Sequence, residues 1–166
     1  MEDYRQGNEV PTRIRHVVLV GVGNEFGTDD ALGVLVAREI RRRVPAGLKV
    51  VEASGEGASL IETWKGADEV IIVDAMAGPE PGEIHRIDAS SSGVPKGLSL
   101  FSSHAFGVAD AIEMARHLHQ LPPVTILYGI EGEAFDPGVG LSDSVLKSMP
   151  RLLAMIEQDL CRIKSN

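Results

Sequence analysis

The sequence contains a single cysteine, Cys161, among its 166 residues. A lone cysteine cannot form an internal disulfide, which is typical of proteins that work in a reducing compartment. The amino terminus also lacks the apolar core of a secretory signal, because residues 1–16 are polar and include Glu2, Asp3 and Glu9. We therefore expect a cytoplasmic protein, in which Cys161 is a small core residue of an amphipathic C-terminal stretch rather than a nucleophile.

Long apolar runs and basic surfaces are also missing. The longest apolar run, residues 17–22, is far too short to cross a bilayer. The chain has 16 Lys and Arg against 24 Asp and Glu, a formal net charge of -8, and its one basic cluster is Arg41, Arg42 and Arg43. Those arginines follow an apolar run, as cations near the C-terminus of a helix do. Neither a membrane nor a nucleic acid is expected as a partner.

Short β-branched runs alternate with longer segments of helical period. This pattern is typical of an α/β fold with a mostly parallel sheet and helices on both faces. The length fits one domain, which we assign to residues 16–164 after a polar N-terminal extension, residues 1–15. Strands are expected at residues 16–22, 48–53, 69–74, 82–88 and 123–130, and helices are expected to start near Ala31, Ala58, Ala105 and Ser142.

The connections refine this prediction. The third and fourth strands are joined by a segment too short for a helical crossover, so they are either antiparallel neighbours or separated by a wider connection in a mixed sheet. The last helix has apolar residues at three- and four-residue spacing, which predicts one stripe facing the sheet, and Pro150 should kink or split it. Residues 89–100, rich in serine and glycine, are expected to form a flexible surface loop.

The segment 21–30 follows the first expected strand and leads into the first helix, where ligands bind in open α/β sheets. Its three glycines weakly resemble a dinucleotide-binding loop, with Glu52 as the acid at the end of the second strand. However, the third glycine is wrongly spaced, and Asp29 and Asp30 would repel a pyrophosphate at the helix N-terminus. The two carboxylates suit a cation better, although Asp is also a favoured helix cap.

Two further residues extend this candidate site. Asp74 ends the apolar third strand, and His104 stands at the start of another helix. Taken singly, each has a capping or surface explanation, but with Asp30 they form a mixed nitrogen and oxygen set suited to a divalent transition metal with open coordination positions. His16 and His85 have no acidic neighbour that the sequence identifies. The serine-hydrolase elbow and the His-Glu-x-x-His helix are absent as patterns.

Four groups of residues occur in combination along the chain: Gly23-Asn24 with Asp29-Asp30 and Gly33; Ile71-Ile72-Val73-Asp74-Ala75; Ser103-His104 with Gly107 and Ala109-Asp110; and Gly129-Ile130-Glu131 with Gly140-Leu141-Ser142. Together they resemble the nickel-iron hydrogenase maturation endopeptidases, from about residue 17 to about residue 163. The resemblance implies a three-layer α/β/α sandwich with a mixed five-stranded sheet.

The resemblance also implies a function. Such an enzyme removes the C-terminal extension of a nickel-iron hydrogenase large-subunit precursor after nickel insertion. Asp30, Asp74 and His104 would then be both the metal ligands and the catalytic residues, and the nickel would be supplied by the precursor. These ligands bind nickel less tightly than a full thiolate shell, so they could sample the metal without extracting it. Two alternatives stay open: a non-catalytic nickel-reading chaperone of the hydrogenase subunit, and a nucleotide-binding Rossmann-like domain.

Two positions depart from the family pattern. The turn after the second strand often carries an aspartate in the family, and here Glu56 stands in that turn. The Ile-Glu pair of the fifth strand is often followed by proline, and here it is followed by Gly132. These changes do not affect Asp30, Asp74 or His104, but because of them the sequence does not indicate which class of hydrogenase is the substrate.

Overall fold

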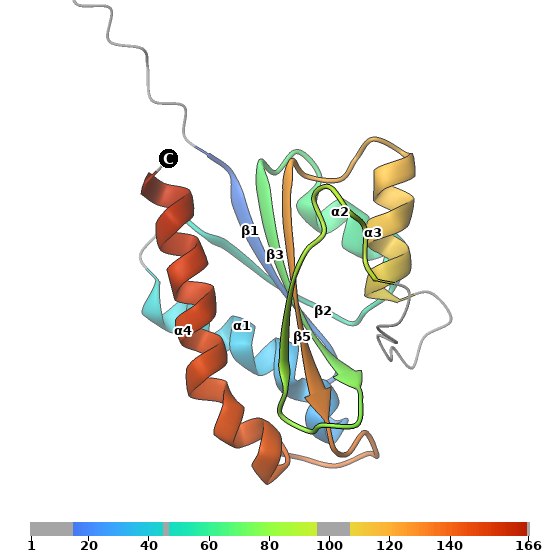
Figure 1. The fold of residues 1–166 in the computed structure, drawn as a ribbon, viewed down its shortest axis with the longest axis vertical. Coiled ribbons are helices and arrows are strands. Elements are labelled where there is room, and N and C mark those ends of the chain that lie inside the picture. Colours follow the sequence, from blue (N-terminus) through green and yellow to red (C-terminus); the bar gives the residue numbers. More distant parts are fainter. Residues whose placement is uncertain (1–14, 45–46, 96–106, 166) are drawn as a thin grey trace, which may run out of the picture.

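A mixed five-stranded sheet forms the centre of the computed structural model, which describes residues 15–44, 47–95 and 107–165 (Figure 1). The strands lie in the order β2-β1-β3-β5-β4, and only β4 runs antiparallel to its neighbour. The predicted mostly parallel, mixed sheet is therefore confirmed. The bounds of the strands are β1 (Val17–Val22), β2 (Lys49–Ala53), β3 (Glu69–Ala77), β4 (Ile84–Asp88) and β5 (Val124–Gly132).

The position of β4 decides between the two arrangements left open for the third and fourth strands. β4 pairs with β5 and not with β3, because β5 returns to lie between them. β5 pairs with β3 in parallel over the full length of both strands, from Glu69 opposite Val124 to Ala77 opposite Gly132. The wider separation is therefore correct, and the antiparallel pairing of β3 with β4 was the wrong alternative.

Helices cover both faces of the sheet and make it the middle of three layers (Figure 1). α1 (Leu32–Arg43) and α4 (Asp143–Ser165) pack on one face, and α2 (Gly57–Trp64) and α3 (Val108–His117) pack on the other. A short 3-10 helix, η1 (Thr28–Ala31), precedes α1. The α/β/α sandwich is confirmed, and the three arginines form the last turn of α1 as expected. The expected helix start at Ala105 lies outside the described residues.

β3 is apolar between Glu69 and Asp74 because both of its faces are covered. Ile71 and Val73 belong to the core under α1 and α4, whereas Val70 and Ile72 belong to the core under α2 and α3. Such two-sided burial produces a continuous apolar run rather than an alternating one. Asp74 continues the second series, so its side chain lies on the face covered by α2 and α3.

α4 confirms the apolar stripe and corrects two details. The buried apolar side chains along it are Val145, Leu152, Leu153, Ile156, Leu160 and Ile163. Cys161 is exposed and is not a core residue, because one position beyond Leu160 turns a side chain by about 100° around the helix. Pro150 is also exposed and does not split α4, which continues from Asp143 to Ser165.

The expected flexible loop at residues 89–100 is described only as far as Pro95, and its start is anchored. Ala89 is fully buried, and Arg116 of α3 donates hydrogen bonds to the carbonyl groups of Ala89 and Ser90. The backbone N–H of Thr125 donates to Ser90 Oγ at 2.9 Å. The first residues of this segment are therefore held against β5 and α3, contrary to the expectation.

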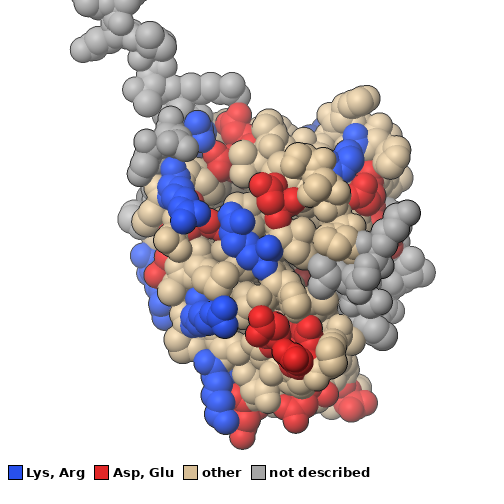
Figure 2. Space-filling view, viewed as in Figure 1, with Lys and Arg blue, Asp and Glu red and all other residues tan. Residues whose placement is uncertain are grey.

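Charged side chains are distributed unevenly over the face drawn in Figure 2. Lys and Arg lie mainly over α4, and acidic side chains gather towards the lower edge, where β5 ends in Figure 1. Among the helices of the described residues, none is long and apolar enough to cross a membrane.

Candidate functional site

Glycines place Asp30 close to the carboxyl end of β1 and beside β3. A Cβ atom on Gly23, which has a φ of +147°, would overlap the carbonyl oxygen of Asp30. A Cβ atom on Gly33 would overlap the carbonyl oxygen of Val22 and would lie 2.5 Å from that of Val73. These glycines therefore allow η1 and the start of α1 to sit directly on the end of β1 and on the middle of β3. The role of these glycines is therefore close packing. From the sequence alone, they could also have belonged to a phosphate-binding loop.

Asp29 is fully buried and anchors the segment between β5 and α4. Its Oδ2 accepts hydrogen bonds from the backbone N–H groups of Glu133 (2.8 Å) and Ala134 (3.0 Å), and its Oδ1 accepts one from Ser142 (2.7 Å). Burial raises the pKa of Asp29, but the N–H groups outweigh burial, and the pKa lies below its ordinary value. Asp29 thus links η1 to the segment between β5 and α4. It is not the helix cap that the sequence allowed, since Gly27 occupies the N-cap position of η1.

Asp74 is buried in a different way. The residue is 2% exposed, and its Oδ2 has no hydrogen-bond partner among the described residues. Burial raises the pKa of Asp74 well above its usual range, the negative charge of Asp30 raises it further, and the N–H of Ala75 offsets only part of the shift. The fold therefore brings Asp30 and Asp74 close enough for their charges to interact unfavourably.

His104, the third residue of the expected set, lies outside the described residues, between Pro95 and Gly107. Within the described ranges no group of three His, Cys, Asp or Glu side chains is arranged to hold a metal ion. Of the expected ligands, the described structure thus contains the two carboxylates.

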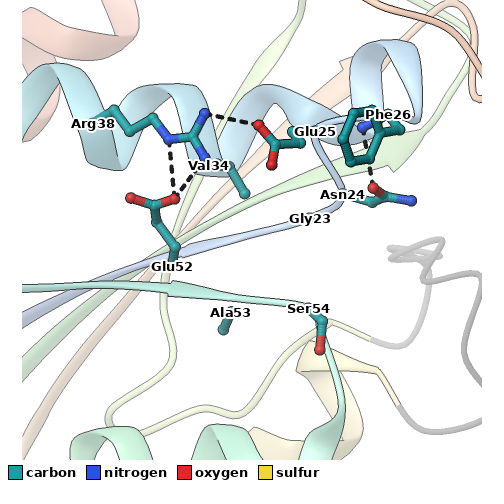
Figure 3. A pocket seen from close by; sticks show the side chains of 9 residues that line it. All are labelled: Gly23, Asn24, Glu25, Phe26, Val34, Arg38, Glu52, Ala53 and Ser54. Atoms are coloured by element: carbon teal, nitrogen blue, oxygen red, sulfur yellow. Dashed lines mark hydrogen bonds and ion pairs between the residues drawn. The ribbon is translucent and has the colours of Figure 1, made fainter.

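A hollow of about 260 Å³ lies beside this edge, between the loop after β1, helix α1 and the end of β2 (Figure 3). Phe26, which is 66% exposed, stands at one side of it. Arg38 forms ion pairs with Glu52 at 2.9 Å and with Glu25 at 3.1 Å. The residues that line the hollow are Gly23, Asn24, Glu25, Phe26, Val34, Arg38, Glu52, Ala53 and Ser54.

Glu52 matters for the dinucleotide interpretation, in which it would bind a ribose hydroxyl. Its carboxylate is held by Arg41 at 2.8 Å in addition to Arg38, and the hydrogen bond from Arg41 is the main reason why the pKa of Glu52 is lowered. Both guanidinium groups come from α1. Glu52 is therefore part of a surface ion-pair network that fastens α1 to β2, and the geometry gives no support to a ribose-binding role.

A pair of residues that sequence reasoning missed lies further along the same edge. His85 Nε2 is 2.8 Å from Glu131 Oε1, and the Glu131 side chain is only 7% exposed. The two residues are 46 positions apart, so only the pairing of β4 with β5 brings them together. The one available signal was Glu131, because it belongs to a motif on which the family resemblance rests.

The structure describes the surroundings of Glu56 and Gly132, the two residues that depart from the family pattern. Glu56 is exposed at the N-cap of α2, where its side chain makes no capping hydrogen bond. A Cβ atom on Gly132 would lie 2.6 Å from the ring of Phe135 and 3.0 Å from Cβ of Asp29. Phe135 thus occupies the space beside Gly132 that a larger residue would need.

Comparison with known proteins decides the family. The family model described as hydrogenase maturation protease matches residues 34–159. The chain belongs to the hydrogenase maturation protease family. It is accordingly an endopeptidase, which favours the first interpretation of the sequence over the nucleotide-binding domain and the non-catalytic chaperone.

Individual members of the hydrogenase maturation protease family cover most of the chain. It is 27% identical over 150 residues to the hydrogenase 2 maturation protease of Escherichia coli, covering 87% of this chain and 85% of that protein. Among solved structures, the hydrogenase maturating endopeptidase HybD from E. coli has a TM-score of 0.74 at 23% identity, covering 89% of this chain and 93% of the other. HybD from Thermococcus kodakarensis has a TM-score of 0.66 at 21% identity, covering 86% and 97%. These structures share the fold.

Proposed function

We propose that this protease removes the C-terminal extension of a nickel-iron hydrogenase large-subunit precursor once nickel has been inserted. It recognises the nickel of the precursor through Asp30, Asp74 and His104, which also form the catalytic site. In this proposal the metal arrives with the substrate. We place the reaction in the cytoplasm, in keeping with a chain that has one exposed cysteine and no internal disulfide.

The observation that carries the proposal is the unfavourable state of Asp74. A buried carboxylate with a partnerless oxygen, beside a second carboxylate, is costly without a cation. A divalent metal would relieve the burial penalty and the repulsion from Asp30 together. Carboxylate and imidazole ligands are also a suitable set for nickel presented by a cysteine-rich centre, because they compete weakly with thiolates.

The surroundings of the site support a cationic partner. Exposed acidic residues in the loops at this edge add to the negative field around Asp30 and Asp74. These residues are Glu80, Glu83 and Glu133, together with Asp143 at the start of α4. The name of a second relative, the hydrogenase expression/formation protein HupD of Bradyrhizobium diazoefficiens, also points to hydrogenases; it is 28% identical over 120 residues.

The chemistry follows from these groups. Hydrolysis of a peptide bond needs an electrophilic carbonyl carbon, an activated water and a group that accepts a proton from it. Nickel carried by the precursor would supply the Lewis acid. A carboxylate or the imidazole among Asp30, Asp74 and His104 would accept the water proton. Because the three proposed ligands serve the metal and the water, protonation of the departing amine is left to another group.

Mass spectrometry of the precursor tests this proposal. Nickel-loaded and nickel-free precursors are incubated with the wild-type protein, with His104→Ala and with His117→Ala, an exposed histidine of α3 that serves as control. We expect a C-terminal peptide to be lost only from the loaded precursor, with wild type and His117→Ala but not with His104→Ala. Equal cleavage of both precursors, or full activity of His104→Ala, would overturn nickel recognition. Cleavage of neither form of the cognate precursor would overturn the proposed substrate.

A further inference from the structure

His85 lies in the same row of the sheet as Asp74. The strand registers place Asp74 of β3 and His85 of β4 opposite the same residue, Gly129 of β5, which lies between them. Ile84 belongs to the core under α1 and α4, and Ile87 packs against the core under α2 and α3. Because side chains alternate along a strand, His85 shares the second face with Asp74.

Gly129 leaves the two side chains without an intervening one. Neighbouring strands are about 4.8 Å apart, so the Cα atoms of Asp74 and His85 are separated by about 10 Å. No side chain of the sheet stands between them, since the only residue between them in the row is glycine. This width allows a peptide group to be approached by Asp74 from one side and by His85 from the other. The next row towards the centre of the sheet is entirely apolar: Ile72, Leu127 and Ile87.

His85 is held by a carboxylate that is itself fixed. Glu131 Oε1 lies 2.8 Å from His85 Nε2, and Glu131 Oε2 accepts the backbone N–H of Glu80 at 2.6 Å. The Glu131 carboxylate fills the place that a side chain at Gly78 would take. The hydrogen bond from Glu80 keeps the pKa of Glu131 below its ordinary value, against the effect of burial and with the help of His85. Glu131 therefore stays ionised, which favours a proton on Nε2 and leaves Nδ1 as the nitrogen that can meet a substrate.

We propose that His85 is a further catalytic residue, which gives a proton to the departing amine, and that Glu131 is its positioning residue. This inference rests on the proposed function. The water oxygen bonds to the carbonyl carbon while one water proton passes to the acceptor at the metal site. The C–N bond then breaks, its electron pair stays on nitrogen, and that nitrogen takes the proton from Nδ1 of the His85 imidazolium. Transfer of the water proton through solvent restores the imidazolium, so no further reactant is needed.

The test is single-turnover cleavage of the nickel-loaded precursor by the full chain. His85→Ala should lower the rate constant by about 10²- to 10³-fold, the usual contribution of a general acid, while the Kd for the precursor stays the same. Added imidazole should restore part of the rate in His85→Ala but should not affect the wild type. Glu131→Gln keeps an acceptor for Nε2 and should lose about 10-fold. His16→Ala is the control and should behave as wild type, because His16 is an exposed histidine just before the amino end of β1, at the end of that strand opposite to the proposed site.

The outcomes separate this inference from the function on which it rests. Wild-type cleavage with an equally fast His85→Ala would overturn the role of His85 and leave the proposed function standing. A slow His85→Ala that imidazole does not rescue, and that binds the precursor more weakly, would also overturn it, because that pattern indicates a structural role. Failure of the wild type to cleave would count against the proposed function itself. If His85→Ala does not fold, His85→Gln can replace the hydrogen bond to Glu131 and is expected to be folded and slow.

Discussion

Asp29 and Asp74 are two buried carboxylates near the same edge of the sheet, and their surroundings are opposite. Asp29 accepts three backbone hydrogen bonds from the segment between β5 and α4. Asp74 has an oxygen without a partner among the described residues and faces the charge of Asp30. The pKa of Asp29 is lowered and that of Asp74 is raised, so the protein stabilises the ionised form of one group and destabilises that of the other.

This difference in hydrogen-bond partners separates the two acids better than burial does. Both residues are nearly inaccessible to solvent, at 0% and 2% exposure. What distinguishes them is whether the protein itself supplies the partners that an anion needs. Asp29 finds its partners within the fold, whereas Asp74 Oδ2 has none among the described residues, and in our proposal the nickel of the precursor supplies one. An unfavourable carboxylate of this kind is a candidate for a functional group.

The largest expected effect is the loss of activity in Asp74→Asn. The substitution keeps the shape of the side chain but removes the charge, so we expect cleavage of the nickel-loaded precursor to fall by at least about 10³-fold, or about 4 kcal/mol of transition-state stabilisation. Single-turnover assays followed by mass spectrometry measure the rate. Asp136→Asn, at an exposed position near the same edge, is the matched control and should stay active. A rate for Asp74→Asn within a factor of ten of wild type would contradict the functional role of Asp74.

The second effect concerns stability at Asp29. Asp29→Ala leaves three N–H groups without their acceptor, so the free energy of unfolding should fall by about 3 kcal/mol or more. This corresponds to a decrease in Tm of about 10 °C for a chain of this size. Thermal unfolding followed by circular dichroism measures it, with Asp136→Ala as the control. An unchanged Tm would mean that the segment between β5 and α4 does not depend on Asp29.

The third effect has the opposite sign. Asp74→Asn should raise the free energy of unfolding by about 1–2 kcal/mol at neutral pH, because a poorly compensated buried charge is removed. The folded-state pKa of Asp74 is above its ordinary value of 3.8, so ionisation costs stability at higher pH and this cost disappears as the pH falls.

Urea unfolding of the wild type and of Asp74→Asn, from neutral pH down to 3.8, measures the prediction. The advantage of Asp74→Asn over wild type should shrink as the pH falls from the raised folded-state pKa towards 3.8. The contribution of Asp29 follows the reverse course, because its folded-state pKa is lowered; its stabilisation is present above 3.8 and is lost at lower pH. A destabilised Asp74→Asn at neutral pH would show that the Asp74 charge is satisfied within the fold.

The sequence could locate these acids but could not assign their roles. Asp29 and Asp30 are adjacent, and both suit a helix start or a cation equally well. Only the tertiary contacts reveal that Asp29 turns towards Ser142, more than a hundred positions away, while Asp30 acts on Asp74. The strand that contains Asp74 was predictable because four apolar residues precede an acid, a pattern that two-sided burial imposes. Its end was not, because β3 continues past Asp74 to Ala77.

The strand order and the pairing of His85 with Glu131 were also beyond what the sequence alone could predict. The alternation of strands and helices predicted the α/β class, and local periodicity placed most elements within a residue or two. The insertion of β5 between β3 and β4 depends on long-range pairing, which no local pattern encodes. The pairing of His85 with Glu131 follows from that insertion, so it could not be foreseen either. Cys161 was misplaced because an amphipathic period defines a stripe but not its edges.

The smallest expected effect tests how closely residues pack around Asp29 and its three backbone hydrogen bonds. In Gly132→Ala the new methyl group would lie 2.6 Å from the Phe135 ring and 3.0 Å from Cβ of Asp29, so one of them must move. Phe135 is only partly buried and can shift, which limits the loss to about 1 kcal/mol. If the ring is the obstacle, Phe135→Leu should remove most of the added cost of Gly132→Ala in a double-mutant cycle measured by urea unfolding. If the losses of unfolding free energy from Gly132→Ala and Phe135→Leu simply add, the new methyl group displaces Asp29 and not Phe135. Gly132 is then needed to keep Asp29 in place.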